Sequence, residues 1–261
     1  MLSLDYKNEI TIYEIISLIM SIVALIIPFL QWLWKKVLRK PKIKYYPNGK
    51  AKLFFNQSGS YLRIDGVIEA INQPVSIKKI ELSVLRKSDS KRMNLAWSSF
   101  ISPIAQNFVG NISHTTELAH PFRISEDSIA CAFTEFCDEF NSSFKSITLN
   151  TKALFDSVSA IKAANQNYQD GLEAYKHSNL YTRAQQFVAK KFFWDISKYD
   201  LTITISYLNK KEEFKYQIEV NESDNSILTG NIEELLIYPL KEAYGVNNAM
   251  STVDAELREI T

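Results

Sequence analysis

Residues 14–36 read EIISLIMSIVALIIPFLQWLWKK, and this stretch decides how the rest of the chain is interpreted. Between Glu14 and Lys35 no side chain is charged, and most are Ile, Leu, Val or Phe. A helix over residues 15–34 rises about 30 Å, the thickness of the hydrocarbon core of a bilayer. A buried core helix usually keeps a polar face, and a cleaved signal peptide has a basic start, a shorter apolar run and a small-residue cleavage site. We therefore expect a retained transmembrane helix.

The charges that flank this helix differ in sign on its two sides. Residues 1–14 carry three acids and one lysine, whereas residues 35–44 form a basic juxtamembrane segment with six Lys or Arg and no acid. The positive-inside rule predicts an extracytoplasmic tail and a cytoplasmic C-terminal domain at the inner membrane. Aromatic and basic side chains near the helix ends are the predicted membrane interface: Tyr13, Trp32, Trp34, Lys35, Lys36, Arg39 and Lys40. The basic segment either fixes topology alone or also binds anionic lipid headgroups, each cation adding about 1 kcal/mol.

A narrow stripe of small residues runs along one side of the helix. It consists of Ser17, Ser21, Ala24 and Pro28 at helical spacing. Stripes of small residues let membrane helices approach closely, so we predict helix association through this face, although the strong GxxxG pattern is absent. The alternative is that the two serines bond back to their own helix.

The composition limits the classes of function. The net charge is only +1, which is less than the basic segment supplies, so the rest of the chain offers no basic face for nucleic acid. Cys131 and Cys137 show no metal spacing and no disulfide framework, and they fit a reducing compartment as small buried residues. The three histidines, His114, His120 and His177, lack a recognised ligand spacing. No nucleotide-binding or hydrolase motif is present. We expect no cofactor and disfavour an enzyme.

Short alternating segments predict a mainly-β domain over residues 45–245. In Tyr61–Ile71 the apolar residues alternate with polar ones, and Leu201–Val220 reads as a hairpin with a polar loop at its centre. The turn-punctuated spacing of the strands favours an immunoglobulin-like β-sandwich. Helical periodicity at about 145–192 then predicts an α-helical insertion in this sandwich.

Two further segments follow the hairpin. Asn231 resembles the N-cap of a short helix that Pro239 kinks or ends. Residues 246–261 form a polar tail, predicted to be partly disordered or to make one helix at Val253–Ile260.

Several aromatic residues in and after the insertion are candidates for binding a partner. They are Tyr168, Tyr175, Tyr181, Phe192, Phe193 and Trp194. Tyrosine and tryptophan are frequent in interface hot spots, and the alternative is that these side chains pack in the core. The acidic group Glu135, Asp138 and Glu139 beside Cys137 is interpreted as a solvated strand end rather than a catalytic pair.

Two functions fit this layout. The first is a membrane-tethered interaction module that holds a cytosolic protein partner or ligand at the inner membrane. The second is an oligomerising single-pass effector, of the kind found in bacterial defence or toxin-like proteins, that perturbs the bilayer on activation. Fold alone does not choose between them.

Overall fold

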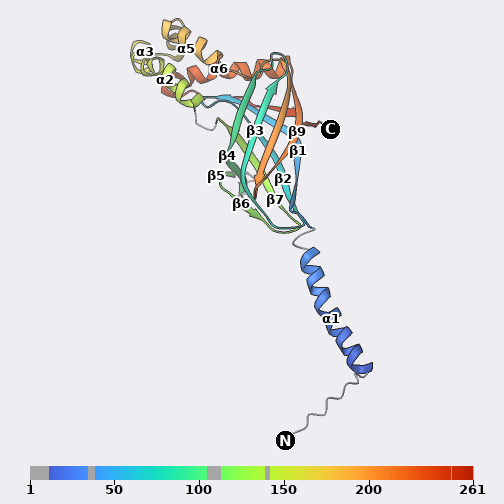
Figure 1. The fold of residues 1–261 in the computed structure, drawn as a ribbon. Helices are drawn as coiled ribbons and strands as arrows, with labels where there is room; N and C mark the ends of the chain where they lie inside the picture. The colour runs from blue at the N-terminus through green and yellow to red at the C-terminus, as the bar shows by residue number, and fades with distance from the viewer. Residues whose placement is uncertain (1–11, 35–38, 105–112, 139–141, 248, 261) are drawn as a thin grey trace.

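The computed structural model describes residues 12–34, 39–104, 113–138, 142–247 and 249–260. One long apolar helix, α1 (Ile12–Leu33), precedes a β-rich body and extends away from one end of it (Figure 1). The remaining helices lie at the opposite end of that body (Figure 1). The order expected from the sequence, which is apolar helix, strands, helical insertion and hairpin, is therefore found.

The strands of the described chain form a single sheet that curls into a nearly closed barrel. They are β1 (Lys42–Asn56), β2 (Gly59–Ile71), β3 (Val75–Arg86), β4 (Arg92–Ile104), β5 (Ser113–Leu118), β6 (Phe122–Ile124), β7 (Ser128–Cys137), β8 (Ser197–Tyr207), β9 (Lys210–Val220), β10 (Val253–Glu256) and β11 (Arg258–Glu259). Their order is β10-β1-β2-β7-β4-β3-β8-β9-β11, with β5 paired to β4 and β6 to β3. The pairings are antiparallel, and the hairpin β8–β9 is the one that the sequence predicted.

The C-terminal strand segment closes the barrel between β1 and β9. Strand β10 pairs with β1, and β11 pairs with β9. The link between them is also bonded, because the Leu257 N–H donates to the Gly49 carbonyl at 2.9 Å. We call residues 251–260 the C-terminal strap. The helix predicted at Val253–Ile260 is therefore wrong: these residues form short strands, and Val253, Ala255 and Leu257 alternate into the core.

The predicted immunoglobulin-like sandwich is also wrong, because one sheet curls on itself instead of two sheets packing face to face. Alternation of apolar and polar residues reports only that one face of each strand is buried, which holds equally for a sandwich and a barrel. The β1–β2 register shifts between Pro47 and Ala51, which marks a β-bulge or irregularity in this pair. Gly66 lies opposite this bulge, where a Cβ atom would come within 2.7 Å of the Tyr46 carbonyl oxygen.

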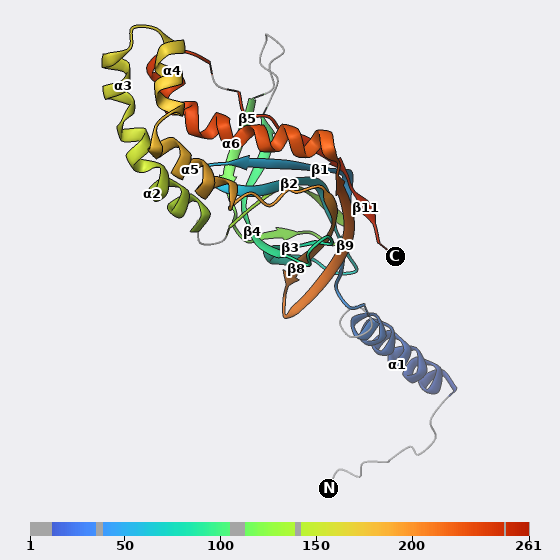
Figure 2. The same cartoon turned by 90° about the horizontal axis from the view of Figure 1, so that it is seen from above.

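The helices form a layer at the end of the barrel opposite α1, and the described part of the predicted insertion, between β7 and β8, contains four of them. They are α2 (Ser142–Asp156), α3 (Val158–Ala164), α4 (Tyr168–Lys176) and α5 (Asn179–Ala189), followed after β9 by α6 (Glu222–Ala243). Helix α6 lies across the barrel end near β1, and the insertion packs beside α6 (Figure 2).

Helix α6 begins ten residues earlier than the sequence predicted. Its N-cap is Asn221, whose side chain accepts from the Asp224 N–H while Asp224 bonds back to the Asn221 N–H. Asn231 instead lies inside the helix and is buried. Its Nδ2 donates to the Ser251 carbonyl at 2.7 Å, and its Oδ1 accepts from the Ser251 N–H at 2.9 Å. Asn231 thus holds the start of the C-terminal strap on α6.

Candidate functional site: the end of the barrel next to α1

Helix α1 is long and apolar enough to cross a bilayer, although a signal sequence near an N-terminus shares both properties. None of its described residues is buried against the rest of the protein. Its length of 22 residues corresponds to about 33 Å. In the predicted association stripe, the Ser21 hydroxyl donates to the Ser17 carbonyl at 2.8 Å, which is the back-bonded alternative. The predicted interface residues Tyr13, Trp32 and Trp34 are exposed.

The segment that follows α1 is bonded to two turns of the barrel. The Arg39 guanidinium pairs with Glu126 in the β6–β7 turn at 3.5 Å. In the β2–β3 turn, the Gln73 side chain donates to the Arg39 carbonyl at 2.6 Å and the Asn72 side chain to the Lys40 carbonyl at 3.1 Å. These contacts hold Arg39 and Lys40 against the β2–β3 and β6–β7 turns, just before the chain enters β1. Of the other predicted interface residues, Lys35 and Lys36 lie outside the described residues.

A hollow of about 520 Å³ lies at this end of the barrel. We call it the basic hollow; it is lined by Lys40, Pro41, Lys42, Asn72, Tyr207, Lys210, Lys211 and Glu212. The first three residues belong to the juxtamembrane segment and the start of β1, and the last four belong to the β8–β9 hairpin. Four lysines face one carboxylate, so the lining has an excess of positive charge.

The carboxylate of the basic hollow has partners within the fold. Glu212 Oε2 accepts from the Tyr207 hydroxyl at 3.1 Å and from the Ile43 N–H at 3.3 Å. Burial, followed by the neighbouring Glu212 charge, raises the pKa of Tyr207 to about 12, so its hydroxyl remains a donor at neutral pH. Glu212 is therefore engaged in closing the barrel end, where β1 meets the hairpin.

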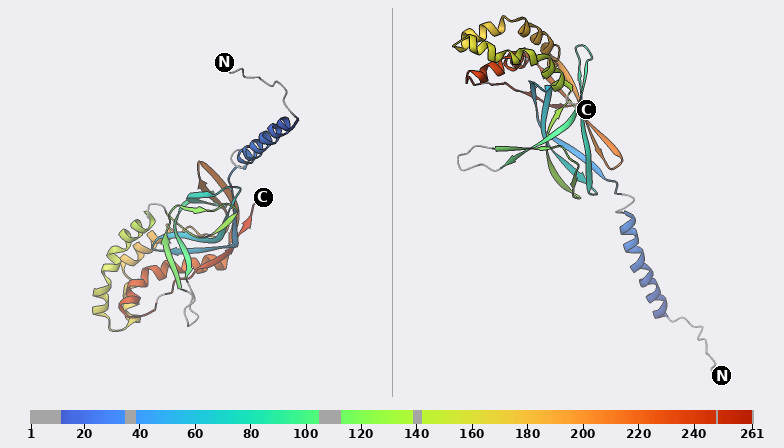
Figure 3. Two further views of the ribbon diagram at one scale, coloured as in Figure 1. Left: turned by 90° about the horizontal axis from the view of Figure 1, so that it is seen from below. Right: turned by 90° about the vertical axis from the view of Figure 1, so that its left-hand side faces the viewer.

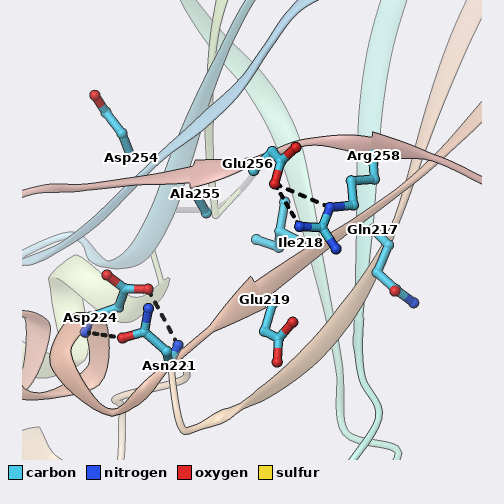
Figure 4. Close-up of a pocket in the computed structure, with 9 residues that line it drawn as sticks. All are labelled: Gln217, Ile218, Glu219, Asn221, Asp224, Asp254, Ala255, Glu256 and Arg258. Atoms are coloured by element: carbon cyan, nitrogen blue, oxygen red, sulfur yellow. Dashed lines mark hydrogen bonds and ion pairs between the residues drawn. The ribbon is translucent and has the colours of Figure 1, made fainter.

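A second, smaller hollow of about 280 Å³ lies under the C-terminal strap, among β9, β10, β11 and the start of α6 (Figure 4). Its acidic side chains are Glu219, Asp224, Asp254 and Glu256. The Arg258 guanidinium reaches Glu256 at 2.6 Å and holds the pKa of that carboxyl below its usual range. Asp224 is engaged in the N-cap of α6. Two of the four acidic side chains in this hollow are therefore engaged in contacts within the fold. No group of three metal-ligating side chains occurs among the described residues.

The cysteines and histidines noted in the sequence lie apart from one another in the described part of the chain. Cys131 is exposed, contrary to expectation, whereas Cys137 is half-buried, and burial raises the pKa of its thiol to about 11. His120 Nδ1 lies 3.0 Å from the Leu118 carbonyl, and His177 Nδ1 lies 2.7 Å from the Glu173 carbonyl. The side chain of His114 and all of Glu139 lie outside the described residues. The Cys137 thiol does lie beside a carboxylate, because its Sγ donates to Glu135 Oε1 at 3.8 Å, and burial raises the pKa of Glu135. Among the described residues, neither His120 nor His177 has a recorded contact with this pair.

Five of the six predicted partner-binding aromatics pack inside the protein. Tyr175 and Trp194 are fully buried; the Tyr175 hydroxyl donates to the Leu236 carbonyl at 3.0 Å, and Trp194 Nε1 to the Phe54 carbonyl at 2.8 Å. Tyr181, Phe192 and Phe193 are buried as well. Only Tyr168 is half-buried, with its ring 5.9 Å from that of Tyr244. The five buried side chains pack among the helices and against β1, so we withdraw them as contact residues.

Arg86 anchors the segment that carries three of these aromatics. Its guanidinium donates to the Phe193 carbonyl at 2.9 Å and pairs with Asp89 and Asp195. The Tyr199 hydroxyl donates to the same Phe193 carbonyl at 3.1 Å. A buried arginine with two carboxylate partners is an ordinary structural clamp.

Comparison of the chain with protein-family models, with curated proteins and with solved structures found no match.

The basic hollow is the site that sequence reasoning missed in part. The basic segment was recognised, but Lys210 and Lys211 were interpreted only as the loop of a hairpin. Adjacent lysines at a hairpin tip carry no signal by themselves. Their place beside Lys40 and Lys42 follows from the sheet order, which the sequence did not reveal.

Proposed function

We propose that the chain is a single-pass protein of the inner membrane whose barrel lies in the cytoplasm and holds a protein partner near the bilayer. Helix α1 supplies the anchor, and the basic segment supplies the orientation. The bonds from the β2–β3 and β6–β7 turns to Arg39 and Lys40 keep the barrel next to the anchor.

The observation that carries the proposal is the filled interior of the barrel. Barrels of about eight strands either fill their interior with side chains or hold one small ligand there. Here large inward side chains from several strands, including Phe55, Phe136 and Tyr199, are no more than 1 % exposed. Such packing favours recognition on the outer surface, which suits a protein partner better than a small molecule.

The partner surface is assigned to the outer face of α6, at the membrane-distal end. Ile227 and Tyr238 are 42 % and 43 % exposed and lie eleven residues apart, which is three helical turns, so they share one face. Neither residue was singled out from the sequence. Exposed tyrosine and aliphatic side chains on a rigid helix are suitable anchors for an interface.

The test compares alanine variants of the full chain purified in mild detergent. We expect Tyr238→Ala and Ile227→Ala to lose the copurifying partner without a change in melting temperature. Ile129→Ala is the matched control, because Ile129 is also exposed but lies on β7 of the barrel wall. Retention of the partner by both α6 variants would exclude this face.

A second candidate function is the oligomerising effector. It is favoured by the same bonds at Arg39 and Lys40, because they would transmit a movement of the barrel to the span. Native mass spectrometry of the purified complex separates the two functions. A chain of 30.0 kDa with an unlike partner supports the scaffold, and multiples of 30.0 kDa alone support the effector.

A further inference from the structure

We propose that the basic hollow binds the phosphate of an anionic phospholipid headgroup. Its four lysines, Lys40, Lys42, Lys210 and Lys211, come from two segments that lie 170 positions apart in the sequence and meet at one end of the barrel. None of the four makes an ion pair with a carboxylate of the described residues. The ammonium groups are therefore available to an external anion.

The single carboxylate in the lining of the hollow does not balance the charge of its four lysines. Glu212 is the one carboxylate in its lining, and its Oε2 atom already accepts two hydrogen bonds, from Tyr207 and from Ile43. The Asn72 side chain donates to the Lys40 carbonyl. Lysine is a compact point charge that serves widely as a ligand for phosphate oxygens. A hollow with four such groups and one engaged carboxylate is suited to a phosphate monoester or diester.

The position of the hollow along the chain selects a lipid as the source of that phosphate. Lys40 follows the last residue of α1, Leu33, by seven positions, which limits the separation to about 25 Å even in a fully extended chain. Leu208 lies in the turn of the same hairpin, two residues before Lys210, and its apolar side chain is 43 % exposed. An apolar tip next to cations is typical of surfaces that meet the headgroup layer.

This inference rests on the proposed membrane location and adds a ligand to it. Each cation near an anionic surface increases binding roughly fivefold, so removal of two lysines is expected to weaken binding roughly 30-fold. The measurement is a titration of the full chain, in neutral detergent, with phosphatidylglycerol, with bound lipid counted by native mass spectrometry. The variant Lys210→Gln/Lys211→Gln is compared with the control Lys190→Gln/Lys191→Gln, an exposed lysine pair at the helical end.

The expected result is a roughly 30-fold weaker affinity for phosphatidylglycerol in the hollow variant and an unchanged affinity in the control. Equal binding by the wild type and the hollow variant would overturn the proposal, and so would an equal loss in both variants, which would indicate diffuse surface charge. A parallel arm adds inorganic phosphate. Displacement of the lipid by millimolar phosphate would assign the hollow to a soluble phosphate compound and overturn the lipid source.

Alkaline carbonate extraction of membranes separates this inference from the proposed function. A chain that stays in the membrane but does not select phosphatidylglycerol refutes the lipid site and leaves the anchor intact. A chain that is extracted refutes the proposed function, whatever its lipid binding.

Discussion

Replacing Asn231 by alanine should release the C-terminal strap from the barrel. The Asn231 side chain makes two hydrogen bonds to the backbone of Ser251, at 2.7 Å and 2.9 Å, from a site that is 2 % exposed. A hydrogen bond of this kind contributes about 1 kcal/mol net, so the loss of both lowers the stability of the strap by about 2 kcal/mol. That free energy corresponds to a roughly 30-fold increase in the population of strap-open molecules.

Hydrogen exchange on the full chain in detergent measures this opening directly. The reporters are the backbone N–H groups of Leu257 and Ile260, which donate to the carbonyls of Gly49 and Lys215. We expect these two amides to exchange roughly 30-fold faster in Asn231→Ala. Ser251→Ala is the matched control, because Ser251 uses only backbone atoms in the pair and should exchange like the wild type. Unchanged protection in Asn231→Ala, or equal loss in the control, would refute the strap as a separately opening element.

Three further predictions concern the barrel. Gly66→Ala should lower the free energy of unfolding by about 1–3 kcal/mol in denaturant titrations, because its Cβ meets the Tyr46 carbonyl; an unchanged midpoint would contradict this. Arg86 holds the pKa of Asp89 at about 2 against an ordinary 3.8, so the wild type should lose stability as pH falls from about 4 to 2, and Asp89→Asn should lose less over that window. Alkylation of Cys137, measured in a Cys131→Ser background, should be slow at pH 8 and rise toward pH 11; a plateau below pH 9 would exclude the raised pKa.

The sequence predicts individual strands of the barrel, but it does not predict that the sheet closes. Residues Leu201–Val220 show two clear period-2 runs, and the structure joins them as β8 and β9. Closure depends on β10, which has four residues, and β11, which has two. Segments this short carry no reliable periodicity, and their pairing depends on contacts made by Asn231 and Gly49 far along the chain.

The helical insertion shows a second reason why the sequence could not predict the structure fully. Its aromatic residues exceed one apolar stripe, which suggested an exposed recognition surface. The excess arises because the layer packs on both the barrel and α6: Tyr175 reaches the Leu236 carbonyl, and Trp194 reaches that of Phe54. The sequence reports how apolar a helix is, whereas the number of neighbours it packs against is a tertiary property.

The basic hollow contains one part that the sequence predicts and one part that it does not. The basic segment at residues 35–44 is a contiguous charge run, so its place next to the apolar helix could be predicted. Lys210 and Lys211 join it only because the β8–β9 turn ends at the same end of the barrel as the start of β1. Figure 3 shows that this hairpin end and α1 lie on the same side of the barrel, away from the helical layer.

The most direct test of the account is the side of the membrane on which the barrel lies. Cys131 is exposed on the barrel wall and serves as a native reporter in a Cys137→Ser background. Spheroplasts that contain the full chain are treated with a membrane-impermeant maleimide before and after permeabilisation, and the labelled protein is followed through carbonate extraction. We expect Cys131 to be labelled only after permeabilisation and the chain to stay in the membrane pellet. Labelling of Cys131 in intact spheroplasts, or release of the chain by carbonate, would contradict a cytoplasmic barrel held by α1.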